Sequence, residues 1–484
     1  MSPLSRSSTV RLAAAVSLAL AALPAWAIAR PSPEAAPHAT VRPAAAPELS
    51  QAEQSAIDRA AAQILASTQV PSASIAVVKG GRLVYVKAYG SRRLDPAIPA
   101  APAARYGIGS ISKQFTATAI LLLAEEGKLS LDDPVGRYVP GLTEGGGVTI
   151  RQILSHTSGY RDYWPQDYVM QDMLVPTTPG HILDRWARIP LDFAPGAEWQ
   201  YSNTGYTIAG LIIEKVTGRS YLEFIRDRMF RPLGMTSATE DDTGPLEPGD
   251  ARGYMRYALG PLHPAPKEGA GWLFGMGGLA MTPRDLALWD IGQIDRAVLK
   301  PASYDQQFTS VKLNDGKETG YGLGVFVRTV NGRRELEHGG EISGFLAENR
   351  VFPDQKAAIV VLTNADFSNA DTALADRIEQ VLFPDTDATA AARGLFDQLR
   401  GGTIDRSRLS PNANTYFSAR ALKDFAASLG PLGDPASFTR RSLSMRGGMT
   451  SEVYRVTYPD RTLTIVMRAW PDGKVEQYLI QPAQ

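Results

Sequence analysis

The chain has 484 residues, of which 44% are hydrophobic and 21% charged, and its 50 lysines and arginines balance 50 aspartates and glutamates. This length allows a large core and more than one domain. A neutral chain without a basic block is not expected to bind nucleic acid. With no cysteine and five scattered histidines, the sequence contains no zinc-ligand spacing and no disulfide framework, so we expect no metal and no other cofactor.

The N-terminus has the pattern of an export signal. Two arginines precede the apolar run 12–23, which is followed by Pro24 and by the small-residue pattern A-W-A at 25–27. We predict a signal peptide over 1–27, with cleavage after Ala27, or after Ala29 if the pattern at 27–29 is used. An uncleaved membrane anchor is the alternative, which Pro24 and the cleavage pattern disfavour. The protein is therefore predicted to be periplasmic or secreted, with no stable membrane insertion after cleavage and no lipidated cysteine.

The next segments predict a spacer and then a mixed domain. Residues 28–50 are rich in proline and alanine without apolar periodicity, which is typical of a disordered spacer, and folded structure is expected from about Leu49. The stretch 73–90, "ASIAVVKGGRLVYVKAYG", predicts a hairpin around Gly80-Gly81. Helical patterns follow over 113–127, 208–218 and 221–229, and strand patterns return over 322–330, 333–340, 345–352 and 357–364. The order predicts one sheet, assembled from distant segments, with an inserted helical region in an α/β (α+β) domain over 51–383.

The C-terminal part has a different character. Residues 384–393 are predicted to be a linker, and 394–484 a small α+β accessory domain. Two helical patterns, near 390–400 and 418–428, precede four alternating runs, over 437–445, 451–458, 462–470 and 474–480. This order is similar in outline to cystatin-like or NTF2-like folds. No catalytic grouping is evident in this segment.

The stretch 107–120, "GIGSISKQFTATAI", places a cation at the start of an otherwise apolar helix. If the helix begins near Ser110, then Ser110 and Lys113 are i and i+3 and lie on one face of its first turn. The positive end of the helix and partial burial both favour the neutral form of Lys113. A neutral lysine can accept the proton of a serine hydroxyl, and the backbone N–H of Ser110 can hold an oxyanion.

Two weaker interpretations accompany this pair. Ser112 is the poorer nucleophile candidate, because no base lies three residues beyond it. An S-x-x-K pattern also occurs by chance, with the serine as a helix cap and the lysine reaching for solvent. The apolar positions 120–124 are expected to lie in the core.

Two further motifs favour the catalytic interpretation. They are Tyr201-Ser202-Asn203 in "EWQYSNTGY" and His338-Gly339-Gly340 in "ELEHGGEISGF". In the order S-x-x-K, Y-x-N and [K/H]-x-G, the sequence resembles the serine β-lactamase and penicillin-binding protein superfamily, in its class C branch with D-Ala-D-Ala carboxypeptidase, D-aminopeptidase and esterase relatives. The resemblance extends over about 51–383 and includes "KLSLDDPVGRYVP", "ILSHTSGY", "FAPGAEWQYSNTGY" and "GMGGLAMTPRDLALW". It implies a β-lactamase/transpeptidase-like fold, an antiparallel sheet flanked by helices.

The resemblance also implies a role for each motif residue. Ser110 matches the nucleophile, Lys113 the base or proton relay, and Tyr201 the phenol that helps to activate Ser110 and protonates the leaving group. Asn203 matches the amide that orients Lys113 and the substrate. Gly339 and Gly340 match the strand edge along which substrate lies, and Glu341 the second oxyanion N–H beside that of Ser110.

His338 departs from the family pattern, because β-lactamases usually have a lysine there. Histidine is mostly neutral near pH 7, so strict β-lactamase activity is in doubt. We predict an exported serine hydrolase that acts on a small-molecule or peptide substrate through an acyl-enzyme, with peptidase, esterase and lactamase activities left open. The alternative is a non-catalytic protein that binds a peptide or cell-wall ligand.

Other motifs have weaker interpretations. His156, in "ILSHTSGY", is adjacent to a serine, but neighbouring side chains do not form a nucleophile-base pair, so a turn-forming structural role is favoured. The run 275–280 fits G-x-G-x-x-A without a preceding strand, which disfavours a dinucleotide site. No G-x-S-x-G is present, so the α/β-hydrolase fold lacks its nucleophile motif.

Overall fold

The computed structural model describes residues 48–483, except 167, 243–247, 331–332, 385–386, 436 and 459–460. The predicted signal peptide and residues 28–47 of the predicted spacer lie outside the described residues. Leu49 is already buried, and Ser50 caps the first helix, α1 (Gln51–Thr68), through a reciprocal pair of hydrogen bonds with Glu53. Among the described residues, the folded structure includes Leu49, near which the sequence predicts it to begin.

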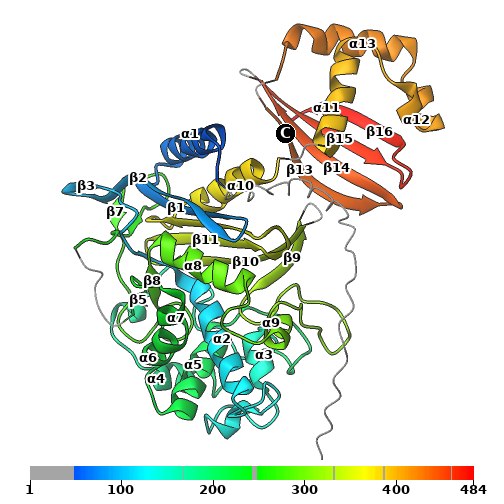
Figure 1. Ribbon diagram of the computed structural model, residues 1–484. Coiled ribbons are helices and arrows are strands. Elements are labelled where there is room, and N and C mark those ends of the chain that lie inside the picture. Colours follow the sequence, from blue (N-terminus) through cyan, green and yellow to red (C-terminus); the bar gives the residue numbers. More distant parts are fainter. Residues whose placement is uncertain are drawn as a thin grey trace, which may run out of the picture. The chain divides into compact units, whose positions relative to one another are not determined.

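A seven-stranded antiparallel sheet forms the centre of the first domain (Figure 1). Its order is β3-β2-β1-β12-β11-β10-β9. The bounds are β1 (Ser72–Lys79), β2 (Arg82–Leu94), β3 (Ala97–Pro99), β9 (Phe326–Val330), β10 (Arg333–Ile342), β11 (Phe345–Phe352) and β12 (Ala357–Thr363). The predicted hairpin is β1–β2, and β1 pairs with β12, with Ala73 opposite Thr363. The prediction of one sheet made from distant segments is confirmed.

Alternation along the strands gives the sheet two buried faces. On β1, Ala73, Ile75 and Val77 pack in a cluster with residues of α1 and α10 (Ala370–Leu382), whereas Ala76 and Val78 belong to the large core of the helical region. We call the α1/α10 side the outer face and the other side the inner face. Figure 1 shows α1 and α10 on one side of the sheet and the inserted helices on the other.

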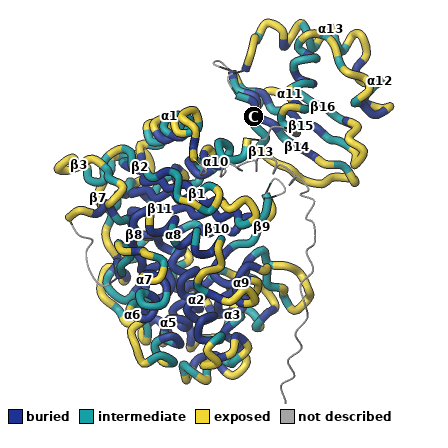
Figure 2. Tube along the Cα trace, in the orientation of Figure 1, coloured by how far each residue is buried: buried dark blue, intermediate teal, exposed yellow. Residues whose placement is uncertain are grey.

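The helical region covers the inner face. Its helices are α2 (Ser112–Glu125), α3 (Ile150–Leu154), α4 (Pro179–Trp186), α5 (Asn203–Thr217), α6 (Tyr221–Ile225), α7 (Arg231–Leu233), α8 (Pro283–Ile294) and α9 (Pro301–Gln307). Short strands accompany them: β4 (Tyr106–Gly107), β5 (Thr239–Glu240), β6 (Tyr254–Met255), β7 (His263–Pro264) and β8 (Leu279–Met281). Helix α2 runs through the middle, and every residue from Ser112 to Leu123 is buried (Figure 2). The apolar positions 120–123 thus lie in the core, as expected.

The C-terminal domain has its own core. Its helices are α11 (Asp387–Arg400), α12 (Pro411–Tyr416) and α13 (Ala419–Leu429), and its strands β13 (Ser437–Arg446), β14 (Met449–Thr457), β15 (Thr462–Ala469) and β16 (Val475–Pro482) form an antiparallel sheet in sequence order. Its buried cluster contains only residues between 392 and 480. The predicted fold class, a sheet flanked by helices plus a small α+β domain, is confirmed.

The linker predicted over 384–393 is shorter than expected, because the chain is helical from Asp387 onward. The reason is an apolar pattern at helical spacing: Ala392, Leu395, Phe396 and Leu399 are all fully buried in the C-terminal core. The alanine-rich segment therefore starts the first helix of the domain. Helix α12 was not predicted.

Candidate active site

Ser110 lies in a single 3-10 turn, Gly109–Ile111, directly before α2. The helix therefore starts two residues later than the sequence pattern suggested. Gly109 has a φ of 49°, and a Cβ on it would lie 2.5 Å from the backbone nitrogen of Glu341. Only glycine lets the turn come this close to β10, and this approach brings the Ser110 turn beside the third motif.

Lys113, in the first turn of α2, is completely buried and points at Ser110. Its Nζ lies 2.9 Å from Ser110 Oγ, 2.8 Å from Asn203 Oδ1 and 2.9 Å from the carbonyl oxygen of Met276. All three partners are uncharged. Burial lowers the pKa of Lys113 to about 7, although the charge of Asp162 acts in the opposite direction.

These contacts determine where the lone pair of the neutral amine points. The amide oxygen of Asn203 and the carbonyl oxygen of Met276 can only accept hydrogen bonds, so they take the two N–H groups of a neutral Lys113. The Ser110 hydroxyl can donate, and it occupies the remaining position 2.9 Å from Nζ. The neutral lysine therefore directs its lone pair at the proton of Ser110.

Asn203 is the first residue of α5, and Asp162 fixes its orientation. The backbone N–H of Asn203 donates to Asp162 Oδ1 at 2.9 Å, and its side-chain amide nitrogen lies 3.4 Å from Asp162 Oδ2. The amide oxygen is thus turned towards Lys113. Asp162 is buried, which raises its pKa.

Tyr201 lies against the same lysine, with its ring centre 4.9 Å from Lys113 Nζ. Desolvation raises the pKa of the Tyr201 phenol well above its usual value, and the interaction with the Ser110 hydroxyl offsets only part of that rise. The phenol is therefore protonated at neutral pH.

His156 supports the position of Tyr201. The two ring centres are 4.2 Å apart, and His156 Nδ1 accepts the backbone N–H of Ser202 at 3.1 Å. His156 has a φ of 61°, in the left-handed region, as its predicted turn-forming role allows. It touches Tyr201 rather than any serine hydroxyl.

His338, on β10, uses both ring nitrogens within the protein. Nδ1 lies 2.6 Å from the carbonyl oxygen of Gly339, which can only accept, so Nδ1 carries the proton. Nε2 then accepts from the hydroxyl of Tyr321 at 2.9 Å. Burial and the nearby Lys113 lower the pKa of His338 to about 3, so its ring is neutral. No positive charge is available there for a substrate carboxylate.

The edge of β10 is open where the third motif lies. Strand β9 pairs with β10 only as far as Phe326 opposite Glu337, so Gly339 and Gly340 lie beyond it. Gly340 packs directly against the carbonyl group of Ile108, where a Cβ would collide. The glycine thus keeps the Ser110 turn against the strand.

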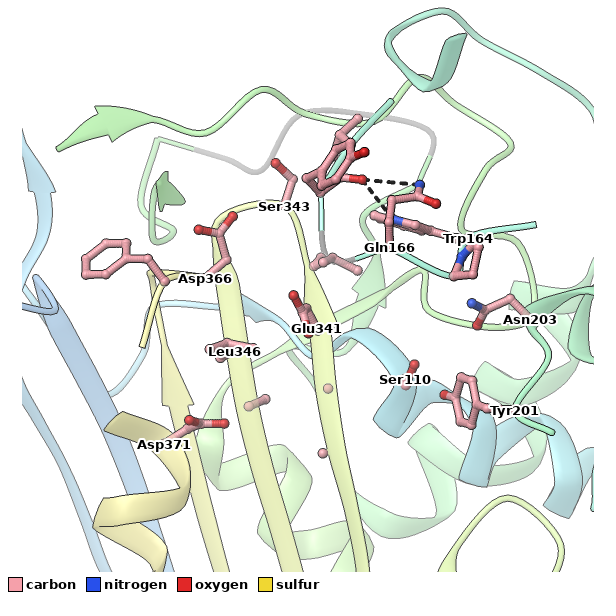
Figure 3. Close-up of a pocket in the computed structure, with 18 of the residues that line it drawn as sticks. Ser110, Trp164, Gln166, Tyr201, Asn203, Glu341, Ser343, Leu346, Asp366 and Asp371 are labelled. Atoms are coloured by element: carbon pink, nitrogen blue, oxygen red, sulfur yellow. Dashed lines mark hydrogen bonds between the residues drawn. The ribbon is translucent and has the colours of Figure 1, made fainter. Parts of the chain in front are cut away.

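A pocket of about 1120 Å³ opens at this edge. It is lined by Ser110, Tyr201 and Asn203 on one side and by His338, Gly339, Gly340 and Glu341 on the other. Figure 3 shows Ser110 and Tyr201 pointing towards the space beside β10. All the predicted site residues except Lys113 therefore line this pocket. Lys113 is buried behind Ser110.

Sequence reasoning missed three partners, namely Asp162, the Met276 carbonyl and Tyr321. Ser112 is buried, and its hydroxyl accepts the backbone N–H of Leu279.

Within the described part of the chain, no group of three or more His, Cys, Asp or Glu residues is arranged to hold a metal ion. No helix in that part is both long and apolar enough to span a bilayer.

A family model described as Beta-lactamase matches residues 57–383. The chain belongs to the beta-lactamase family. Protein flp of Staphylococcus aureus (strain MW2) is 31% identical over 327 residues, 65% of this chain, and penicillin-binding protein 4* of Bacillus subtilis (strain 168) is 29% identical over 326 residues. The match covers 64% of protein flp, slightly less than two thirds, and 72% of penicillin-binding protein 4*.

Solved structures that are similar to the chain share its fold. A D-stereospecific amidohydrolase from Streptomyces sp. superposes with a TM-score of 0.60 and 27% identity, over 68% of this chain and 98% of its own. D-amino acid amidase from Ochrobactrum anthropi SV3 gives 0.60 and 25%, over 68% and 97%. The octameric penicillin-binding protein homologue from Pyrococcus abyssi, at 22% identity and a TM-score of 0.58, covers 88% of this chain and therefore extends into the C-terminal domain.

Proposed function

We propose that the protein is an exported serine hydrolase, in which Ser110 forms an acyl-enzyme from an amide or ester and water releases it. One observation carries the proposal: Lys113 Nζ lies 2.9 Å from Ser110 Oγ, is fully buried, and has a pKa of about 7. A buried amine without a carboxylate partner is suited to accept a proton near neutral pH.

In the acylation step, the Ser110 hydroxyl proton passes to Lys113 Nζ while Oγ bonds to the substrate carbonyl carbon. The backbone N–H groups of Ser110 and Glu341 stabilise the oxyanion. When the bond to the leaving group breaks, Tyr201 donates its phenol proton to that group and regains one from Lys113. The raised pKa of Tyr201 supports this role of proton donor over that of a tyrosinate base.

In the deacylation step, water takes the place of the leaving group. Lys113, neutral again, accepts a proton from water while the water oxygen attacks the acyl carbon. The bond to Ser110 Oγ breaks, and the proton returns to that oxygen. Asn203, held by Asp162, keeps Lys113 aimed throughout both steps.

The third motif favours substrates without a carboxylate beside the scissile bond, because His338 is neutral and both its ring nitrogens are occupied. The similar structures named as a D-stereospecific amidohydrolase and a D-amino acid amidase support an amide as the substrate bond. Small amides and esters are therefore expected to be better substrates than penicillins.

We further propose that residues 1–27 direct export and that 394–484 form an accessory domain. The family match ends at residue 383, and the C-terminal buried cluster is separate from the others. A chain ending at Pro384 is expected to fold and hydrolyse a small ester. A folded but inactive truncation would mean that the C-terminal domain completes the site.

The test of the central proposal is covalent labelling with a fluorophosphonate, read by intact mass. Wild type should gain one adduct, Ser110→Ala none, and Ser112→Ala most of the wild-type labelling. Labelling that persists in Ser110→Ala would refute the nucleophile. Folded wild-type protein that takes up no label and turns over no ester would instead support a ligand-binding protein.

A further inference from the structure

The pocket does not end beside Ser110 but continues round β10 to the outer face of the sheet. Successive strand residues point to opposite faces. Gly340 faces the Ser110 turn, so Gly339 faces the outer side, together with its cross-strand partner Glu348. We call this part of the pocket, lined by Glu337, Gly339, Leu346, Glu348 and Asp371, the outer lobe. In Figure 3, Leu346 and Asp371 lie to the left of β10, and Ser110 and Tyr201 to its right.

Carboxyl groups border the outer lobe on one side of Gly339. A Cβ on Gly339 would lie 3.7 Å from Glu348 Oε2 and 4.0 Å from Glu337 Oε1. Asp371, in the first turn of α10, lines the same lobe. All three side chains belong to residues that are more than nine-tenths buried. The missing side chain of Gly339 therefore leaves a space bordered by acid oxygens.

The cations near these carboxyls are already paired. Arg350 bonds to Glu348 Oε1 at 2.7 Å and also pairs with Asp376 and Glu379, and Arg333 pairs with Glu379 as well. Arg328 lies 3.0 Å from Glu337 Oε2. Three guanidinium groups thus face six acids, which are Glu335, Glu337, Glu348, Asp371, Asp376 and Glu379. The cluster therefore has more acidic than basic groups.

Glu348 shows this deficit most directly. Its residue is only 5% exposed, and while Oε1 bonds to Arg350, the described residues offer Oε2 no hydrogen bond. This oxygen borders the pocket at Gly339, so it can accept a hydrogen bond from a group that enters there. Burial raises the pKa of Glu348 to about 8 and also raises that of Glu337, so protons supply part of the missing positive charge when nothing else does.

The lining of the whole pocket also has more acidic than basic residues. It contains Arg256 as its one arginine or lysine among the described residues, against the acids Asp162, Glu337, Glu341, Glu348, Asp366 and Asp371. A metal ion does not fit these acids, because no group of three among the described residues has the arrangement to hold one. An ammonium group, which donates hydrogen bonds in several directions to separate oxygens, does fit.

We propose that the outer lobe binds an ammonium group of the substrate, which Glu348, Glu337 and Asp371 hold at Gly339 while the scissile carbonyl lies at Ser110. The open edge of β10 lets one substrate reach both places. The substrate class is then an amide, ester or peptide that carries a free amino group. This inference deepens the proposed function and rests on it.

The test compares two fluorophosphonates that differ only at the end of one six-carbon arm, which carries an ammonium group in one reagent and a methyl group in the other. The arm is placed on phosphorus in one pair and on the alkoxy oxygen in a second pair, so that both directions from Ser110 are covered. At low ionic strength, the cationic reagent of one pair should label Ser110 at least about tenfold faster than its neutral partner. Added salt should reduce this advantage.

Variants assign the advantage to the outer lobe. Glu348→Gln and Asp371→Asn should each remove most of it, whereas Asp305→Asn, an exposed acid on α9, should keep the wild-type ratio. Equal labelling by both members of both pairs would overturn the proposal. So would a preference for the cation that survives unchanged in Glu348→Gln and Asp371→Asn.

A second measurement does not depend on turnover or labelling. Hexylamine should bind to the Ser110→Ala protein in calorimetry, and hexanol should not, with amine binding lost in the Ser110→Ala/Glu348→Gln double variant. Failure of all labelling with retained amine binding would refute the hydrolase function and keep the subsite. Labelling of wild type without any amine binding or cationic preference would keep the hydrolase and refute the subsite.

Discussion

Two buried cations in this chain meet opposite surroundings. In the C-terminal domain, Arg440 pairs with Glu452 at 2.8 Å, and Tyr454 donates a hydrogen bond to the same carboxylate. In the first domain, Lys113 is completely buried, and the three groups that bond to its Nζ are all uncharged. One cation has a carboxylate counter-ion and the other does not.

The difference shows how burial can serve either stability or chemistry. A buried guanidinium with a bonded carboxylate stays charged and holds β13 to β14. A buried ammonium without such a partner loses its preference for the charged form, so it can exchange a proton near neutral pH. In the C-terminal domain, a carboxylate offsets the free-energy cost of burying a cation. In the first domain, the same cost lowers the pKa of Lys113. Changes at each site should therefore have different consequences.

The largest expected effect follows from making the charge of Lys113 permanent. Lys113→Arg should lower kcat/KM for p-nitrophenyl butyrate by about 10²- to 10⁴-fold, because a guanidinium cannot accept the Ser110 proton. Lys128→Arg, at an exposed lysine, is the matched control and should retain wild-type activity. Retention of activity in folded Lys113→Arg would remove Lys113 as the base.

Removing the counter-ion of Arg440 should affect stability instead of catalysis. Glu452→Gln leaves a buried guanidinium without its carboxylate and should cost about 3–5 kcal/mol of the free energy of unfolding of the C-terminal domain. Urea unfolding measures this, with Asp424→Asn, an exposed acid on α13, as the control. Ester hydrolysis by the folded protein should be unchanged, and a large loss of kcat would contradict the separation of roles.

A smaller effect is expected from adding a cation to the third motif. In His338→Lys, a charge-assisted hydrogen bond to a substrate carboxylate should raise kcat/KM for nitrocefin relative to p-nitrophenyl butyrate by about tenfold. We expect no larger gain, because the new lysine loses the bond to Tyr321 and faces an acidic pocket. His338→Gln is the neutral control. Wild-type hydrolysis of nitrocefin as efficient as that of the ester would contradict the account.

The smallest expected effect is a shift in the pH dependence of kcat/KM. The carboxylate of Asp162 raises the pKa of Lys113, so Asp162→Asn should lower it further. Because Lys113 must be neutral to act as the base, the acid-side midpoint of kcat/KM should move to lower pH in the variant. Asn at this position can still accept the backbone N–H of Asn203, which keeps α5 in place. A midpoint that moves to higher pH would contradict the assignment.

Local patterns were sufficient for part of the site. Ser110 and Lys113 are three residues apart in one continuous turn and helix start, so their contact could be predicted from spacing alone. The hairpin β1–β2 and the buried face of α2 followed from turn residues and apolar periodicity in the same way. Tyr201, Asn203 and His338 were found through the family resemblance, because nothing local links them to Ser110.

The remaining partners come from contacts that no local pattern encodes. Met276 offers a backbone carbonyl, which leaves no trace in side-chain chemistry, and Asp162 acts through Asn203, 41 residues away in the chain. The acids of the outer lobe are spread over β10, β11 and α10, and only the antiparallel register places Glu348 opposite Gly339. The tautomer of His338 depends on Tyr321, which lies in the loop before β9.

The measurement that tests the central claim most directly is the pH dependence of Ser110 labelling by a neutral fluorophosphonate. The account predicts that the rate rises as pH increases and reaches half its maximum near pH 7, because Lys113 accepts the proton only when neutral. The same midpoint should be absent from any residual labelling of Lys113→Arg. A wild-type rate that is independent of pH, or that rises only near pH 10.5, where an exposed lysine loses its proton, would contradict the claim.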